Sequence, residues 1–373
     1  MKKTLFFLLC IVNMGFYVKG QRDRIDWLVG EVLPESNGKK NIGVAGPITG
    51  IIDDKLIIMG GANFPDKMPW DGGIKAYQKA YYVYQISADG QLELISTSYN
   101  VDSVAYSANV SDQGFIYAVG GERNGLATTD VVRISLRNEQ LVKENIPSLP
   151  IALTNGSAAI INGYLYFVGG ENSDLVSKRI YRLNLKSPNE AWEDFVDLPA
   201  PVSHSISLAA QDANLIVIGG RKRNTNAKSD IYKTVYAIDV KTKKLNQLPN
   251  LPEPLAAGTA VNYKGNLIVI GGDNGETFHQ VEQLIADINT SSDEESKNRL
   301  IKEKNALQSS HPGFSKKVYQ LKQGQQKWEL LHLDSGESPV TTTALLKDNL
   351  IIIPSGEIKA GVRTNQILIG KIN

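Results

Sequence analysis

The chain has 373 residues, with 33 glycines, a hydrophobic content of 42% and a formal net charge of +1. Its 40 basic and 39 acidic side chains are balanced, which argues against a nucleic-acid-binding surface or a polyacidic tail. This composition suits many short strands that are joined by tight turns.

The first twenty residues have the pattern of a secretory signal peptide. Lys2 and Lys3 precede the apolar stretch Leu5–Val12, and smaller residues follow up to Gly20. The apolar stretch is too short for a stable membrane span, so we expect export to the periplasm without stable membrane insertion. Cleavage near Gly20 would remove Cys10, the one cysteine, and leave residues 21–373 without disulfide or thiol chemistry.

Six apolar runs that end in glycine divide the rest of the chain. Five of them end in a glycine pair and the sixth ends in Ser355-Gly356. The second glycines lie 49 to 60 residues apart, except for one gap of 84, which is close to the roughly 50-residue period of a kelch-type blade. The runs are Leu56–Gly61, Ile116–Gly121, Leu165–Gly170, Leu215–Gly220, Leu267–Gly272 and Leu350–Gly356. We therefore predict an all-β fold, a single six-bladed kelch-type β-propeller that spans residues 21–373.

Each repeat predicts four strands. A strand of small residues precedes the apolar run, and a strand with aromatic residues, such as Tyr81–Tyr84, and a fourth strand follow it. The last repeat lacks one strand, because only Gln366–Ile372 follows its glycine. The segment 25–33, which ends at Leu33-Pro34, has the pattern of the missing fourth strand. We expect it to pair with 366–372, closing the ring and protecting both edges.

The 84-residue gap predicts a helical insertion of about residues 276–312 in the fifth blade. Val281, Leu284 and Ile288 share one helical face, and Ser292–Glu295 fits a capping box before a second helix. The insertion begins where the loops of the other repeats leave their glycine pairs. Two interpretations are open: a decoration packed on the ring, and a lid over a binding pocket.

Polar residues follow the ends of the apolar runs, where loops from all blades converge on the central channel. They are Ala62-Asn63, Glu122-Arg123, Glu171-Asn172, Arg221-Lys222, Asp273-Asn274 and Glu357. In the last repeat Glu357 leaves the second strand and Arg363 enters the third, with Gly361 permitting the return. We expect these residues to line a concave site, although solvated loop charges, or a loop ion pair of Glu357 with Arg363, would show the same pattern.

The segment Gly356–Thr364 resembles the active-site motif of bacterial sialic acid mutarotases, the N-acetylneuraminate epimerases, which are secreted six-bladed kelch propellers. Gly43–Gly46, the strand Tyr77–Tyr84 and the insertion after Gly272 are also similar to that family. Segments from the C-terminal part of the ordinary family lie at the N-terminus here. The chain thus resembles a circularly permuted branch, a rearrangement that is cheap in a ring whose ends meet.

The resemblance implies a mutarotase that interconverts the α and β anomers of N-acetylneuraminate by acid–base ring opening and closure. It implies Glu357 as the general base and Arg363 as the group that grips the carboxylate of the sugar. It implies a small sugar-acid substrate and no cofactor, while the balanced charge argues against a nucleic-acid partner and the histidine spacing against a metal. Further candidates for substrate binding are Arg221, Arg123, Asn63 and Glu122.

Other functions are weighed against this one. A non-catalytic glycan-binding or scaffold propeller is the alternative, although it has no need of Glu357 and Arg363 over the channel. A sialidase is disfavoured because repeated Ser-x-Asp-x-Gly-x-x-Trp boxes are missing. The tyrosine–cysteine cofactor of the copper-radical oxidases, which also include secreted kelch propellers, needs a cysteine that residues 21–373 lack. The histidines show no metal-ligand spacing, and we interpret His204 as a polar core residue; the four are His204, His279, His311 and His332.

Overall fold

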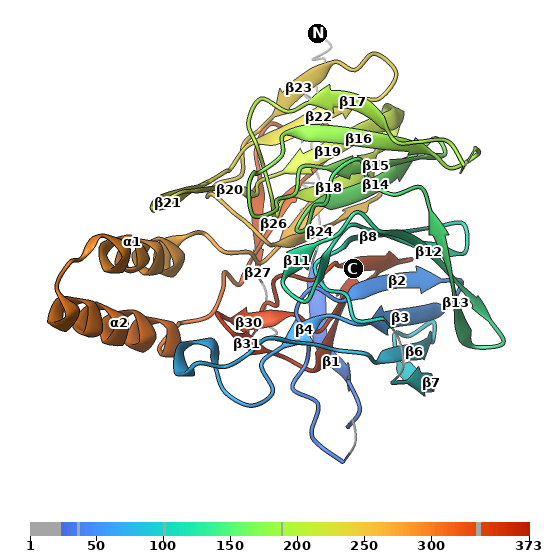
Figure 1. Cartoon of the computed structure of the whole chain (residues 1–373). Coiled ribbons are helices and arrows are strands. Elements are labelled where there is room, and N and C mark those ends of the chain that lie inside the picture. The colour runs from blue at the N-terminus through green and yellow to red at the C-terminus, as the bar shows by residue number, and fades with distance from the viewer. Residues whose placement is uncertain (1–23, 36–37, 100–101, 188, 333–336) are drawn as a thin grey trace, which may run out of the picture.

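A computed structural model describes residues 24–35, 38–99, 102–187, 189–332 and 337–373. Six four-stranded antiparallel sheets form the blades of a propeller, and two helices project from it (Figure 1). The prediction of an all-β six-bladed propeller is confirmed. The predicted signal peptide, residues 1–20, lies outside the described residues, so export and periplasmic localisation stay predictions.

Blades 1 to 3 follow the chain order, from the innermost strand outwards. Blade 1 consists of β2 (Ile48–Ile52), β3 (Lys55–Met59), β6 (Tyr81–Ile86) and β7 (Leu92–Ser98). Blade 2 consists of β8 (Ala108–Asp112), β9 (Phe115–Val119), β12 (Val131–Arg137) and β13 (Gln140–Ile146). Blade 3 consists of β14 (Ser157–Ile161), β15 (Tyr164–Val168), β16 (Arg179–Asn184) and β17 (Glu193–Asp197).

Blades 4 and 5 repeat this order, whereas blade 6 takes its outer strand from the other end of the chain. Blade 4 consists of β18 (Ile206–Ala210), β19 (Asn214–Ile218), β22 (Val235–Asp239) and β23 (Leu245–Leu248). Blade 5 consists of β24 (Thr259–Tyr263), β25 (Asn266–Ile270), β26 (Lys317–Leu321) and β27 (Glu329–His332). Blade 6 consists of β28 (Leu345–Lys347), β29 (Leu350–Pro354), β32 (Gln366–Ile372) and β1 (Ile25–Val32).

The two ends of the described chain meet in blade 6. Strand β1 pairs antiparallel with β32, in a register that runs from Ile25 opposite Ile372 to Val32 opposite Gln366. The innermost strands contact one another in a closed order, since β28 contacts both β24 and β2. The ring is therefore closed at its outer rim by strand pairing and at its centre by packing.

The hydrophobic core consists of six clusters, and each lies between two neighbouring blades. The apolar second strands supply both sides. In β3, for example, Leu56 and Ile58 pack against blade 6, whereas Ile57 and Met59 pack against blade 2. This two-sided burial explains why these strands are continuously apolar and do not alternate with polar residues.

The glycine pairs follow the second strands because the next blade passes close to their backbone. The N–H of Gly170 donates to the carbonyl oxygen of Val202 in the following blade, at 2.9 Å. Gly169 has a φ of +63°, and a Cβ there would lie 2.1 Å from the same oxygen. A side chain at this position would thus collide with the backbone of the neighbouring blade.

Short hairpins extend from the glycine-rich ends of the second strands. They are β4 (Ala62–Asn63) with β5 (Ala76–Tyr77), β10 (Glu122–Arg123) with β11 (Leu126–Ala127), β20 (Arg221–Asn224) with β21 (Ala227–Ile231), and β30 (Glu357–Lys359) with β31 (Val362–Arg363). Two 3₁₀ turns complete the elements, η1 (Pro69–Asp71) in the β4–β5 loop and η2 (Gln211–Ala213) before β19.

Blade 5 has a pair of helices at this position, α1 (Glu276–Thr290) and α2 (Glu294–Ser309). A capping box would make Ser292 the N-cap of α2, but this detail is wrong. Asp293 is the N-cap, because its carboxylate accepts the N–H of Ser296 at 2.8 Å. Among the described residues, neither helix is long and apolar enough to cross a membrane.

Candidate active site

The first residue after each glycine-rich end occupies the same place in all six blades. Each forms an antiparallel bridge with the segment that leads into the innermost strand of its own blade. These six residues, which we call the bridge positions, are Ala62, Glu122, Glu171, Arg221, Asp273 and Glu357. The structure therefore gives the first residue of each predicted channel pair an equivalent position in its blade.

A closed circle of backbone hydrogen bonds lies beside the bridge positions. In each blade one residue with a φ between +52° and +61° donates its N–H to the carbonyl oxygen of its counterpart in the preceding blade. The six distances lie between 2.7 and 3.0 Å. The residues of this backbone circle are Gly46, Tyr106, Asn155, His204, Ala257 and Thr341. Since the circle uses N–H and C=O groups alone, it fixes the spacing of the blades at the channel mouth whatever side chains are present.

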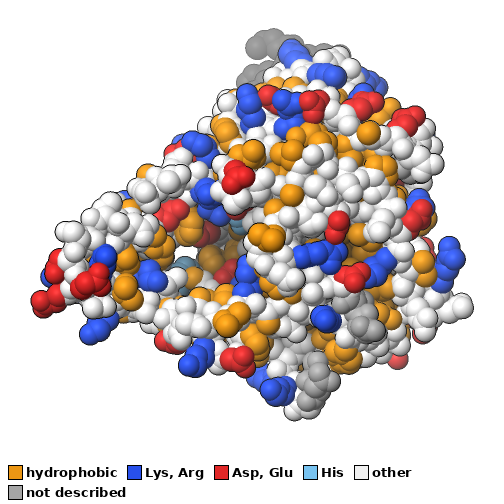
Figure 2. Space-filling view, viewed as in Figure 1, with side chains coloured by type: hydrophobic (Ala, Val, Ile, Leu, Met, Phe, Trp, Pro, Cys, Tyr) orange, Lys and Arg blue, Asp and Glu red, His pale blue; other side chains and the backbone are white. Residues whose placement is uncertain are grey.

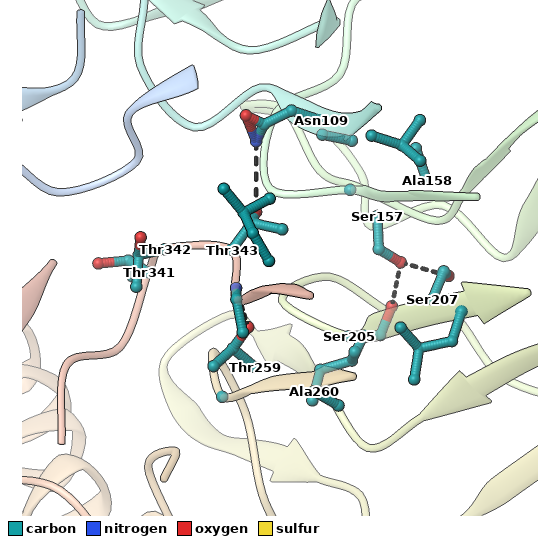
Figure 3. A pocket seen from close by; sticks show the side chains of 18 of the residues that line it. Asn109, Ser157, Ala158, Ser205, Ser207, Thr259, Ala260, Thr341, Thr342 and Thr343 are labelled. Carbon is teal, nitrogen blue, oxygen red and sulfur yellow. Dashed lines mark hydrogen bonds between the residues drawn. The ribbon is translucent and has the colours of Figure 1, made fainter. Parts of the chain in front are cut away.

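Two cavities meet at the backbone circle. The channel between the innermost strands has a volume of about 310 Å³ and is lined by hydroxyl groups, of which those of Ser157 and Ser207 lie 2.7 Å apart (Figure 3). The second cavity, of about 340 Å³, lies between the face of the propeller and the helix pair. Figure 2 shows it as a hollow beside the helices. His204, Ala257 and Thr341 line both cavities and so separate them.

The helix pair forms one wall of the second cavity. Phe278, Val281 and Ile285 of α1 line it. Glu282 of α1 accepts the N–H and the hydroxyl group of Ser229 in β21, at 2.8 and 2.6 Å. The side-chain amide of Asn305 in α2 donates to the carbonyl oxygen of Trp70 in η1 at 2.8 Å. The insertion is thus attached to blade 4 and to blade 1, on either side of the cavity.

Glu357 faces this cavity and is held from behind by Arg363. Its Oε1 accepts the N–H of Gly361 at 2.6 Å and Nη1 of Arg363 at 3.2 Å. Desolvation raises the pKa of Glu357, while the charge of Arg363 and the Gly361 N–H oppose that rise. A raised pKa makes this carboxylate a stronger base than an ordinary glutamate, as a group that accepts and returns a proton requires.

Arg363 itself does not line the cavity. Its side chain is 4% exposed, against 16% for Glu357. Its Nε donates to the carbonyl oxygen of Ala62 at 3.3 Å, and its guanidinium lies 4.8 Å from the ring centroid of Phe64. In this arrangement Arg363 orients Glu357 from the side away from the cavity.

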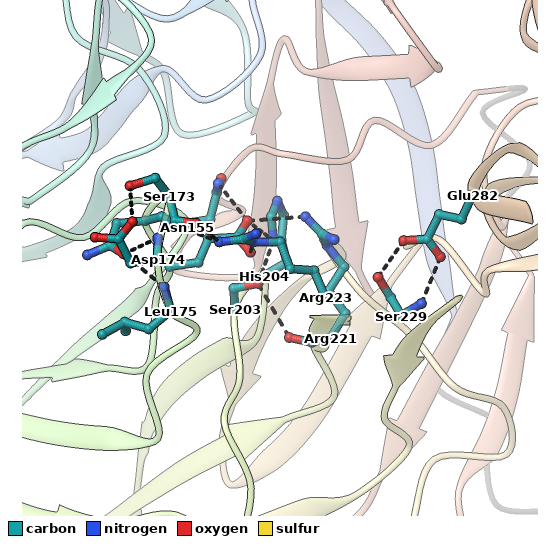
Figure 4. Close-up of polar contacts among 12 residues, drawn as sticks. Asn155, Ser173, Asp174, Leu175, Ser203, His204, Arg221, Arg223, Ser229 and Glu282 are labelled. Carbon is teal, nitrogen blue, oxygen red and sulfur yellow. Dashed lines mark hydrogen bonds and ion pairs between the residues drawn. The ribbon is translucent and has the colours of Figure 1, made fainter. Parts of the chain in front are cut away.

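Arg221 does line the cavity, and it lies near Arg223 and His204 (Figure 4) in a charge cluster around Glu171. Nη2 of Arg221 lies 3.1 Å from Oε1 of Glu171, and Nε of Arg223 lies 3.8 Å from Oε2. Two guanidinium groups thus face one carboxylate, which leaves an excess of one positive charge. The ring of Phe278 lies 5.3 Å from the Arg221 guanidinium and helps to hold it in place.

His204 joins the same cluster as a neutral ring. Its Nδ1 lies 3.1 Å from the hydroxyl oxygen of Ser203 and 3.6 Å from Oε1 of Glu171. Burial and the charge of Arg221 hold the pKa of His204 well below its usual value. The ring therefore contributes hydrogen bonding, not charge, at neutral pH.

Three predicted substrate-binding residues lie outside the cavity lining. Glu122 accepts from Lys75 and from the hydroxyl group of Tyr77. Arg123 forms an ion pair with Asp130 at 3.1 Å. Asn63 is buried, donates to the carbonyl oxygen of Gly43 and accepts from Gln78, at 2.8 Å each. Their roles in substrate binding stay predictions.

The structure adds His311 to the site, and it confirms a cavity position for Asp273, which the sequence pattern placed around the channel without a catalytic or binding role. Asp273 and the buried His311 both line the cavity with Glu357. Nδ1 of His311 accepts the N–H of Gly313 at 3.0 Å, so its Nε2 carries the proton of the neutral ring.

The two remaining histidines are His279 and His332. His279 lies on α1, with Nε2 2.9 Å from the carbonyl oxygen of Ser229, and the side chain of His332 lies outside the described residues. No group of three or more His, Cys, Asp or Glu among the described residues could hold a metal ion.

Comparisons with known proteins agree with the motif around Glu357. Residues 146–373 match the family model described as N-acetylneuraminate epimerase. A protein of that name from Vibrio vulnificus (strain YJ016) is 30% identical over 126 residues, which are 31% of this chain and 32% of the relative. This alignment thus spans about a third of the relative's length. The kelch type of the repeats and the circular permutation stay predictions. The matched region contains Glu171, Arg221, Asp273, Glu357 and Arg363, and the chain belongs to the N-acetylneuraminate epimerase family.

Proposed function

We propose that the protein is a mutarotase that interconverts the α and β anomers of N-acetylneuraminate, with Glu357 as the general base. The observation that carries the proposal is the position of Glu357, a partly desolvated carboxylate held by Arg363 at the edge of a cavity of about 340 Å³. A volume of this size suits a small ligand such as a monosaccharide. The family of the chain supports the choice of sugar.

The reaction needs one proton to leave the substrate and one to arrive. Glu357 takes the proton of the anomeric hydroxyl group, and that O–H electron pair becomes the second bond of a carbonyl group. The bond between the anomeric carbon and the ring oxygen breaks, and the ring oxygen takes up a proton. Rotation of the open keto form, followed by the reverse steps, gives the other anomer. General base catalysis of this kind contributes about 10²- to 10⁴-fold.

The carboxylate of the sugar needs a cation in the cavity. Arg221 suits this role better than Arg363, because Arg221 lines the cavity and its cluster with Arg223 and Glu171 has an excess positive charge. A guanidinium can bind a carboxylate with two parallel hydrogen bonds. Arg363 then acts through Glu357, as a positioning residue. The signal-peptide pattern around Lys2 and Leu5–Val12 supports periplasmic action as part of this proposal.

The direct test is an NMR measurement of anomer exchange in N-acetylneuraminate, with heat-inactivated protein as the control. We expect the native protein to accelerate exchange and to act more weakly on aldoses, which lack the carboxylate. Binding of the sugar without accelerated exchange would support the alternative, a non-catalytic glycan-binding propeller.

A further inference from the structure

The bridge positions include four carboxylates, and three of them have a cation as a close partner. Glu122 is paired with Lys75, Glu171 with Arg221, and Glu357 with Arg363. The fourth, Asp273, has no ion pair among the residues that the structure describes. Its carboxyl group accepts the N–H of Gly275 at Oδ1, at 2.8 Å. Asp273 therefore lines the cavity without an ion-pair partner among the described residues.

Asp273 and Glu357 are structural counterparts. Both are bridge positions, in the neighbouring blades 5 and 6, and both line the same cavity. Their backbones are fixed in the same way, since Asp273 exchanges two hydrogen bonds with Ala256, and Glu357 exchanges two with Val340. A ligand in the cavity thus meets two carboxyl groups that rigid strand ends hold on adjacent blades.

The surroundings of Asp273 raise its pKa. Desolvation raises the pKa of Asp273, and the Gly275 N–H, the neighbouring His311 and His279 and the charge of Arg221 compensate only in part. The charge of Asp273 also raises the pKa of Glu357. The two carboxyl groups line one cavity, so the ionised form of one disfavours the ionised form of the other.

We propose that Asp273 is the second acid–base group of this site and protonates the ring oxygen while Glu357 takes the proton of the anomeric hydroxyl group. This inference rests on the proposed function. On ring opening one proton passes from Asp273 to the sugar, and one passes from the sugar to Glu357. On closure the new hydroxyl group returns its proton to Asp273, and Glu357 protonates the carbonyl oxygen. The site is regenerated without any other reactant.

The test compares Asp273→Asn with the wild-type protein and with Asp174→Asn. The asparagine keeps the oxygen that accepts the Gly275 N–H but cannot donate a proton as an acid does. Asp174 is an exposed loop residue that follows the glycine pair of blade 3. Asp174→Asn therefore makes the same substitution outside the cavity. Anomer exchange is measured by NMR, and binding of N-acetylneuraminate by calorimetry, over a range of pH.

We expect Asp273→Asn to lower the exchange rate by about 10²- to 10⁴-fold with a small change in affinity. The fall of the wild-type rate at high pH, where the acid of the pair is deprotonated, should disappear in this variant. Asp273→Glu should recover part of the rate, because it restores a proton donor. If the asparagine variant proves unfolded, the exchange rate of Asp273→Glu relative to the wild-type rate, and the fall of that rate at high pH, serve as the readout.

The outcomes separate this inference from the function on which it rests. A wild-type protein that does not accelerate exchange would overturn both. A wild-type protein that is active, beside an Asp273→Asn variant with the same rate and the same high-pH limb, would overturn the role of Asp273 alone. A loss of affinity with an unchanged maximal rate would also overturn it, because Asp273 would then be a binding group.

Discussion

The backbone N–H of Gly46 donates to the carbonyl oxygen of Thr341 at 2.7 Å, and this bond joins the first blade to the last. It completes the backbone circle at the channel mouth. The pairing of β1 with β32 joins the two ends of the described chain at the outer rim. Closure at both radii holds the bridge positions Asp273 and Glu357 in a fixed relation to blade 1, where Ala62 contacts Arg363.

Removal of the outer closure should destabilise the protein. Deleting residues 25–33 exposes the edge of β32 and removes Ile25, which is buried between blades 5 and 6. We expect a lower melting temperature and aggregation through the free edge. The measurement is thermal unfolding with size-exclusion chromatography. Leu28→Asp, an exposed position in the same strand, should stay close to wild type. A truncated protein that remained monomeric and equally stable would contradict this closure.

Gly46 should tolerate substitution poorly. It has a φ of +61°, and a Cβ there would lie 2.5 Å from the backbone nitrogen of Tyr106. Gly114 has a φ of +80° with no atom within 4 Å of a Cβ, so Gly114→Ala isolates the cost of the backbone conformation. That cost is about 1 kcal/mol. We expect Gly46→Ala to lose about 1–3 kcal/mol more, because of the collision. If urea unfolding showed that both variants lose the same free energy of unfolding, a tight backbone circle would be ruled out.

The strands, the helical insertion and the ring order of the bridge positions follow from the sequence, because glycine pairs and apolar runs repeat in every blade. The backbone circle does not follow from the sequence, because positive φ is uncommon for residues other than glycine. Its members, such as Tyr106, His204 and Thr341, also share no residue type that would mark the position. Side-chain direction at the bridge positions also escapes prediction. Glu122 is paired with Lys75 of a hairpin in blade 1, whereas Asp273 and His311 share the cavity only because the insertion folds back over it.

Arg221 and Arg363 should separate binding from catalysis. Arg221→Lys keeps the charge but loses the planar fork, so affinity for N-acetylneuraminate should fall about 10- to 100-fold, as for a charge-assisted hydrogen bond of about 1.5–3 kcal/mol. A substrate analogue without the carboxylate should bind equally to both forms. Arg363→Lys should lower the exchange rate and change affinity little, because it disturbs Glu357. Calorimetry and NMR exchange measure the two effects. A carboxylate-dependent loss of affinity in Arg363→Lys alone would assign carboxylate binding to Arg363 instead.

The raised pKa of Asp273 should also appear in stability. The folded protein binds this proton more tightly than the unfolded chain, so the stabilisation is complete at low pH and is lost as pH rises from about 3.8 through the folded pKa. Asparagine does not titrate. The free energy of unfolding of Asp273→Asn, relative to wild type, should therefore increase as pH rises through this window. Urea unfolding at several pH values measures it, with Asp174→Asn as the control. A difference that is constant or decreases with pH would show that folding does not raise this pKa.

The general base is the centre of the account, and Glu357→Gln tests it most directly. Glutamine keeps the size of the side chain and an oxygen that can accept from Gly361 and Arg363, but it cannot take up a proton at neutral pH. NMR anomer exchange in N-acetylneuraminate should fall by about 10²- to 10⁴-fold, while thermal unfolding and affinity for the sugar stay close to those of the wild-type protein. A folded Glu357→Gln protein that exchanges the anomers at the wild-type rate would contradict the assignment.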